Sequence, residues 1–90
     1  MLDIVLSNAF KKDLKLTAKR GYNLDLLNTV IEKLANQETL EEKYRDHSLT
    51  GNYIGFRECH IQPDWLLIYR INNNELFLFL SRTGTYSDLF

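Results

Sequence analysis

Hydrophobic and polar positions in the first twenty residues change from the spacing of a strand to the spacing of a helix. Residues 2–6 form a short apolar run, in part β-branched, which predicts a first strand. Ser7 or Asn8 then stands where a side chain can accept a backbone N–H from the first turn of a helix. We expect that helix to run to about Arg20, because Gly21 is a stop signal just beyond it.

The first predicted helix has an apolar side and a basic side. Phe10, Leu14 and Ala18 form the apolar stripe, and four lysines form the opposite one: Lys11, Lys12, Lys15 and Lys19. A second helix should open near Asn23, and its core positions recur at helical spacing: Leu24, Leu27, Val30, Ile31 and Leu34. The junction between the helices is short, so they should pack as an antiparallel hairpin.

The pattern fails between residues 36 and 52, which show neither a helical nor a strand period. A connection this long in a small domain is usually functional or disordered. Leu40, Tyr44 and Leu49 are apolar enough to predict a connection pinned onto the body of the domain. His47 lies in this connection.

The second half of the chain predicts antiparallel strands at residues 53–61, 65–71 and 75–82. Pro63 and Asp64 should form the tight turn of the first hairpin, because proline presets φ and cannot donate to a ladder. His60 and Trp65 would then face each other across the mouth of that hairpin. The order strand, helix, helix, three strands predicts an α+β domain over residues 1–90, with the helical hairpin on one face of the sheet.

Composition supports one modest hydrophobic core, since 44% of the 90 residues are hydrophobic. No run approaches the roughly 20 apolar residues of a membrane span, and the N-terminal residues do not resemble a secretory signal. The single cysteine, Cys59, rules out an internal disulfide and is expected to be a buried small hydrophobe. We therefore expect a cytoplasmic protein with no membrane partner.

The net charge of −1 does not by itself indicate a nucleic-acid-binding protein. Charge is nevertheless unevenly distributed, because residues 11–20 contain five positive side chains and only one negative one, Asp13. A solvated helix face is the plainer interpretation of this lysine ridge, and a phosphate-facing surface is the alternative.

No sequence signature of a metal site or cofactor is present: there is no CxxC pair, no HExxH and no glycine-rich phosphate loop. The two histidines and Asp64 do not have a diagnostic metal-ligand spacing. Cys59 and His60 cannot act as a nucleophile pair, since adjacent residues of a strand point to opposite faces. We expect no metal and no cofactor.

The residues that remain can do metal-free chemistry. Imidazoles titrate near pH ~6.5, which suits proton transfer, and the planar fork of an arginine suits a phosphate. Taken singly, each has an ordinary structural explanation as a surface or core residue. The set comprises His47, Arg57, His60, Asp64, Trp65, Arg82 and Tyr86.

Four blocks of sequence together resemble one protein family. They are YRDHSLTG at 44–51, FRECHI at 56–61, PDWLLIY at 63–69, and RTGT at 82–85 followed by LF at 89–90. In order, spacing and overall length they are similar to the YafQ branch of the RelE/ParE toxins from bacterial toxin–antitoxin pairs.

The resemblance implies a RelE-like fold and a ribosome-dependent endoribonuclease that cuts messenger RNA during translation. It also implies a cognate antitoxin of the DinJ/RelB type that silences the toxin. The catalytic histidines of the family map onto His47 and His60, its acidic residue onto Asp64 and its C-terminal aromatic onto Phe90. Trp65 and Arg82 lie in matching blocks, and Glu58 stands where the family commonly has an acidic residue.

This chain departs from the family pattern at Tyr86, where YafQ-like chains usually have a third histidine. A phenol with a pKa near ~10 is a weaker acid than imidazolium at neutral pH, but it can donate a hydrogen bond or stack on a base. Three interpretations stay open: an active natural variant, a weakened natural variant, or a substitution introduced so that a toxic protein could be expressed.

The mechanism expected from these residues needs no metal. His60 with Asp64 is assigned to the base that activates a ribose 2′-OH, and His47 or Tyr86 to the acid that protonates the leaving oxygen. Arg82, with Arg57, would stabilise the charged phosphate, Trp65 and Phe90 would stack on bases, and the lysine ridge would contact ribosomal RNA. All of this requires the two imidazoles to converge.

Two rival functions share the fold. A ParE-like toxin would inhibit DNA gyrase and would not require His47 and His60. A non-catalytic protein that mainly binds antitoxin is kept open by Tyr86. Leu16, near the lysine side of the first helix, is one candidate antitoxin contact.

Overall fold

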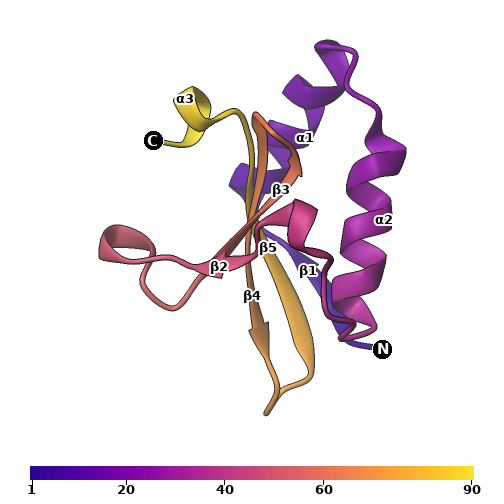
Figure 1. The fold of residues 1–90 in the computed structure, drawn as a ribbon, viewed down its shortest axis with the longest axis vertical. Coiled ribbons are helices and arrows are strands. Elements are labelled where there is room, and N and C mark those ends of the chain that lie inside the picture. Colours follow the sequence, from indigo (N-terminus) through magenta and orange to yellow (C-terminus); the bar gives the residue numbers. More distant parts are fainter.

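The computed structural model describes all 90 residues, which form a five-stranded sheet with two long helices on one face (Figure 1). The strand order is β1-β5-β4-β3-β2. The elements in chain order are β1 (Asp3–Leu6), α1 (Asn8–Lys19), α2 (Leu24–Ala35), the 3₁₀ turn η1 (Glu42–Tyr44), β2 (His47–Ser48), the 3₁₀ turn η2 (Gly51–Tyr53), β3 (Arg57–Gln62), β4 (Trp65–Asn72), β5 (Phe77–Gly84) and α3 (Tyr86–Leu89).

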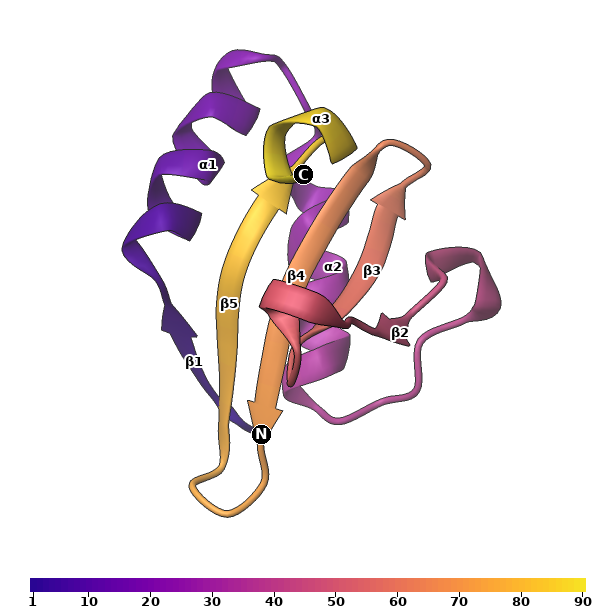
Figure 2. The ribbon, with the colours of Figure 1, turned by 90° about the vertical axis from the view of Figure 1, so that its left-hand side faces the viewer.

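The predicted α+β class and the order of the main elements are confirmed. Strands β2 to β5 pair antiparallel with their neighbours, and β1 pairs parallel with β5 (Figure 2). Parallel pairing of the two chain-distant strands is possible because the helical hairpin carries the chain back along one face of the sheet.

Both long helices begin where the sequence predicts, and Ser7 and Asn23 are their N-caps. The Ser7 hydroxyl accepts from the Phe10 N–H at 2.9 Å, and the Asn23 side chain accepts from the Asp25 N–H at 3.0 Å. No helix has the length and apolar character that a membrane span requires. The apolar stripe of α1 differs from the prediction in one position, since Thr17 is buried and Ala18 is exposed. Thr17 tolerates burial because its hydroxyl donates to the carbonyl oxygen of Asp13 at 2.8 Å.

The two faces of the sheet carry cores of unequal size. Thirteen buried residues from the two helices and the sheet pack on the helix-covered face, including Phe10, Val30 and Leu67. On the other face only Leu66, Ile68 and Leu89 form a buried cluster, partly covered by side chains of the 49–56 segment. This segment and α3 lie on the side of the sheet away from the helices (Figure 1).

The connector is more structured than its sequence predicts. It contains η1, η2 and the two-residue strand β2, which pairs with the first two residues of β3. Strand β3 begins at Arg57 rather than at residue 53, because η2 and the positive φ of Gly55 (89°) turn the chain just before it.

One further boundary was predicted wrongly, and one element was not predicted. Strand β5 begins at Phe77, two residues late, because Leu76 has a φ of 58° and belongs to the turn. No element was predicted for the tail, but it forms the short helix α3. Its N-terminus is closed by a capping box in which Thr85 and Asp88 satisfy each other's backbone N–H groups.

Candidate active site

The expected convergence of the two imidazoles is confirmed. His47 on β2 lies opposite Glu58 on β3 in the strand register, and His60 follows Glu58 by two positions. Alternation along a strand therefore places Glu58 and His60 on one face, next to His47. The two imidazole rings lie 6.4 Å apart between centroids.

Both rings are oriented by backbone carbonyls and share one carboxylate. The Nδ1 atom of His47 lies 2.6 Å from the carbonyl oxygen of Arg45, and that of His60 lies 3.1 Å from the carbonyl oxygen of Pro63. A carbonyl only accepts, so each Nδ1 carries the hydrogen. Each Nε2 then faces Oε1 of Glu58, at 3.5 Å from His47 and 3.6 Å from His60. Glu58 is only 5% exposed and can accept a hydrogen bond from either ring in its protonated form.

The hairpin turn and α3 carry the remaining predicted catalytic groups. Asp64 is exposed in the turn, and its Oδ1 accepts from the backbone N–H of Tyr86 at 3.4 Å. The Tyr86 ring packs on the Phe90 ring at 5.0 Å, and Phe90 also contacts Tyr53 edge-on at 5.7 Å. Tyr86 and Phe90 remain 63% and 52% exposed. The two aromatic rings thus stand beside the turn that follows His60.

The structure overturns the assignment of Trp65 as a base-stacking residue. Trp65 is 1% exposed, its ring meets Tyr22 edge-on at 5.0 Å, and its Nε1–H donates to Thr83 Oγ1 at 2.9 Å. The register pairs Trp65 with Gln62, and a bulge between His60 and Gln62 pairs His60 with Leu66. Trp65 therefore points into the core and does not face His60 across the hairpin mouth.

Both predicted phosphate-binding arginines are held by carboxylates. Arg82 donates to Asp13 through Nε at 2.6 Å and Nη2 at 3.0 Å, and this pair raises the pKa of Arg82. Arg57 donates to Asp46 at 3.1 Å and 3.4 Å, which raises the pKa of Arg57. Arg57 also precedes Glu58 directly in β3, so its side chain leaves on the opposite face from the imidazoles.

The four ridge lysines are exposed on α1 as expected. They form none of the ion pairs of the molecule. Helix α1 packs against β5, whereas the imidazoles lie on β2 and β3 beyond β4, so the ridge is separate from the imidazole pair.

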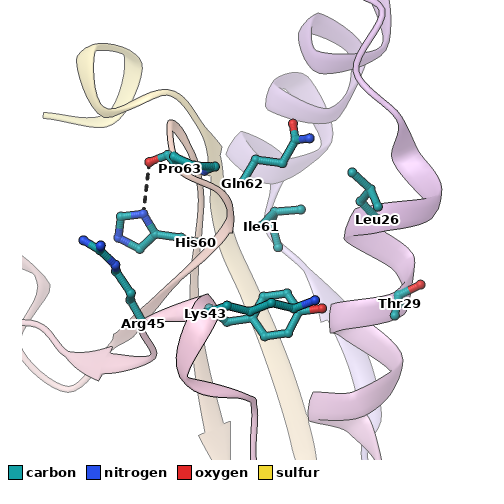
Figure 3. A pocket seen from close by; sticks show the side chains of 9 residues that line it. Leu26, Thr29, Lys43, Arg45, His60, Ile61, Gln62 and Pro63 are labelled. Carbon is teal, nitrogen blue, oxygen red and sulfur yellow. Dashed lines mark hydrogen bonds between the residues drawn. The ribbon is translucent and has the colours of Figure 1, made fainter.

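Sequence reasoning missed a cavity of about 580 Å³ that His60 helps to line. It lies between α2, the η1 segment and the last residues of β3, and Lys43, Arg45 and Gln62 project from its walls (Figure 3). Residues 43–45 adjoin the histidine of the first sequence block, but nothing in their spacing pointed to a cavity. It forms because β2 pairs only with Arg57 and Glu58 and leaves the rest of the β3 edge uncovered.

The structure assembles no group of three or more histidine, cysteine, aspartate or glutamate side chains that could hold a metal ion. Cys59 is fully buried, as predicted, and burial raises the pKa of its thiol. It therefore offers no thiolate for catalysis or metal binding.

Comparison with known proteins places this geometry in a family. Residues 2–90 match the family model described as bacterial toxin of type II toxin-antitoxin system, YafQ. The mRNA interferase toxin YafQ of Escherichia coli K12 is 38% identical over 89 residues, which cover 98% of this chain and 95% of that protein.

Two solved structures show the same fold over full length. A metal-bound toxin from Helicobacter pylori is 49% identical with a TM-score of 0.94, and all of both chains are covered. The E. coli DinJ–YafQ complex is 37% identical with a TM-score of 0.90, covering all of this chain and 99% of that one. The chain belongs to the YafQ family of bacterial toxins of type II toxin–antitoxin systems.

Proposed function

We propose that this chain is an mRNA interferase, an endoribonuclease that cuts messenger RNA on the translating ribosome. The observation that carries the proposal is the pair of imidazoles, each oriented through Nδ1 and both facing Glu58 through Nε2. The E. coli relatives are named mRNA interferases, which supports the same reaction class.

The proposed reaction is an in-line transesterification. A base removes the proton of a ribose 2′-OH, whose oxygen attacks the adjacent phosphorus. An acid protonates the departing 5′ oxygen, which leaves a 2′,3′-cyclic phosphate. His60 with Asp64 supplies the base side, and His47 or Tyr86 supplies the acid side. Oε1 of Glu58 lies within 3.6 Å of both Nε2 atoms and can accept a hydrogen bond from either ring when that ring donates.

The proposal also assigns residues that would bind the phosphate charge and the bases of the RNA. Arg82 would stabilise the phosphate in the transition state through the donors that Asp13 leaves free. The exposed rings of Tyr86 and Phe90 would stack on unpaired bases. The lysine ridge on α1 would contact ribosomal RNA away from the cut.

Antitoxin pairing is also part of the proposal. The E. coli YafQ that shares this fold is complexed with DinJ, and we expect a cognate antitoxin of that kind here. Leu16 on α1 is 44% exposed and is one candidate contact. Action on translating ribosomes would place the protein in the cytoplasm.

Primer extension on a translated mRNA tests the activity directly. The chain should produce cuts within translated codons, and H47Q and H60Q should not, while gyrase supercoiling should be unaffected. Gyrase inhibition without RNA cuts would refute the nuclease and favour the ParE-like function. Toxin that is stripped of bound metal with EDTA and desalted before it enters the translation reaction should cleave as fast as untreated toxin, because the Mg²⁺ that ribosomes need is then left in place. Loss of activity that added metal restores would show that the reaction is not metal-free, a relevant outcome because the H. pylori toxin structure is metal-bound.

A second candidate function rests on Tyr86, which is exposed where the family usually has histidine. In this case the chain would bind antitoxin and cut weakly or not at all. Growth arrest after induction should be compared between the original chain and Y86H. Arrest by Y86H alone indicates a weakened toxin, whereas no arrest by either folded protein would end the enzyme proposal.

A further inference from the structure

The cavity beside His60 has the size and the charge of a site for an anionic ligand. Its volume of about 580 Å³ falls within the roughly 300–1,000 Å³ of small-ligand pockets. Of its nine lining residues none is an aspartate or glutamate, and two are the cations Lys43 and Arg45. An acidic ligand would therefore meet no opposing carboxylate on the cavity wall.

Arg45 differs from most other arginines of the molecule in having no carboxylate partner. Arg20, Arg57 and Arg82 each form an ion pair, with Asp88, Asp46 and Asp13 respectively. Arg45 and Lys43 occur in none of the ion pairs, and both are exposed. The full planar fork of Arg45 is thus available for two oxygens of one phosphate.

The backbone of Arg45 links this cavity to the imidazole pair. Arg45 adopts the left-handed conformation (φ 48°, ψ 41°) at the end of η1, which is uncommon for a residue with a Cβ atom. Its carbonyl oxygen faces Nδ1 of His47 at 2.6 Å, while its guanidinium extends beside the His60 ring (Figure 3). One residue therefore orients the first histidine and brings a cation next to the second.

The remaining walls suit a nucleotide better than a bare phosphate. Gln62 offers an amide that can pair with a base edge, and Leu26, Ile61 and Pro63 supply apolar surface. His60 lines this cavity, so a strand whose phosphodiester is cut at His60 can place its neighbouring nucleotide along the cavity wall.

We propose that this cavity is a subsite for the nucleotide next to the scissile phosphodiester of single-stranded RNA. Arg45 holds the flanking phosphate, Lys43 adds a second positive charge, and Gln62 contacts the base. The inference rests on the proposed nuclease function for its choice of ligand, but RNA binding at the cavity can be measured without cleavage.

Arg45→Gly separates the side chain from the backbone role. Glycine keeps the carbonyl that faces His47 and favours a positive φ, but it removes the guanidinium. Arg45→Lys keeps the charge and loses the fork. Arg70→Ala is the matched control, because Arg70 is an exposed arginine without a carboxylate partner that lies outside this cavity.

Binding should be measured with the full chain and a fluorescent single-stranded RNA whose ribose 2′-OH is methylated at every position, so that it cannot be cut. We expect R45G to raise Kd by about tenfold, R45K by less, and R70A to leave it near the original value. R45G should also lower the salt dependence of binding by about one phosphate contact.

Equal affinities of R45G and R70A would overturn the inference, even if the original chain cuts mRNA. Weakening of antitoxin binding alone by R45G would also overturn it, since the cavity would then serve a protein partner. An Arg45-dependent affinity in a chain that cuts nothing would support the RNA subsite and refute the nuclease function. The two proposals can therefore fail independently.

Discussion

The two faces of the sheet differ in how many residues they bury and in the kind of side chain they expose. The helix-covered face buries thirteen core residues, whereas the opposite face buries three and leaves charged and aromatic groups at its edge. Strand β3 serves both, because Cys59 and Ile61 enter the large core while Glu58 and His60 leave on the other side. Stability concentrated on one face allows the other to hold a polar site that contributes little to folding.

The largest effect expected on the site face is on cleavage. H60Q, tested beside H47Q, should lower the rate by about 10²–10⁴-fold, because a positioned acid or base is lost. The free energy of unfolding should stay near its original value, since both rings are at the margin of the fold. Single-turnover cleavage and urea unfolding of the same preparations measure the two quantities. An unfolding midpoint that falls along with the cleavage rate would show that the histidines also stabilise the fold, which contradicts the division of roles between the two faces.

The largest effect expected on the helix-covered face is on stability. W65A should destabilise the fold by about 3–5 kcal/mol through loss of a buried aromatic ring. I54A, at a side chain that is 77% exposed, is the control and should change little. The milder W65F tests the assignment of Trp65 to the core, because it should cut RNA at nearly the original rate. If W65F stays stable but stops cutting, the indole acts on RNA after all.

An intermediate effect is expected where α1 reaches the sheet. D13N should destabilise the fold by about 1–3 kcal/mol, because Asp13 accepts from the Arg82 guanidinium and from the Thr83 N–H. E32Q, at an exposed α2 position without an ion pair, is the matched control. D13N should also release the Arg82 fork, so RNA affinity should be maintained or rise while stability falls. A drop in both would show that Asp13 is needed to aim Arg82.

The smallest effect concerns the attachment of α3 and its dependence on pH. The Arg20 guanidinium holds the pKa of Asp88 well below its usual range. A depressed carboxyl pKa stabilises the folded form above the ordinary value near ~3.9, and this contribution is lost as the pH falls below it. The protection factors of the amides of residues 85–90, which compare exchange with the intrinsic rate at the same pH, should therefore fall in acid, and D88N should show low protection already at neutral pH. Unchanged protection in D88N would mean that the capping box and Leu89 suffice to hold α3.

Several features of this fold were predictable because they depend on local periodicity. The cap at Ser7, the core positions Leu27, Val30 and Leu34, and the burial of Cys59 all follow from spacing and residue type. Thr85 and Asp88 also carried a capping signal, three residues apart, that would have predicted α3.

The wrong predictions concern side chains whose surroundings are set by contacts between distant parts of the chain. Taken alone, an aromatic residue beside a catalytic turn suggests base stacking. In the structure, a bulge at His60–Gln62 directs the Trp65 side chain into the core, where its indole N–H donates to the Thr83 hydroxyl on β5. Nothing in the sequence near Arg82 indicates a carboxylate partner. The packing of α1 on β5 brings Asp13, 69 positions away, into contact with its guanidinium.

The sequence by itself determined the class of fold, the two histidines and the family, because strand and helix periods and whole motif blocks are written along the chain. Only the tertiary structure decided which cations are free, which aromatic is exposed and that a cavity adjoins His60. Those properties depend on contacts between residues distant in sequence, and a linear pattern does not record which carboxylate neutralises which arginine.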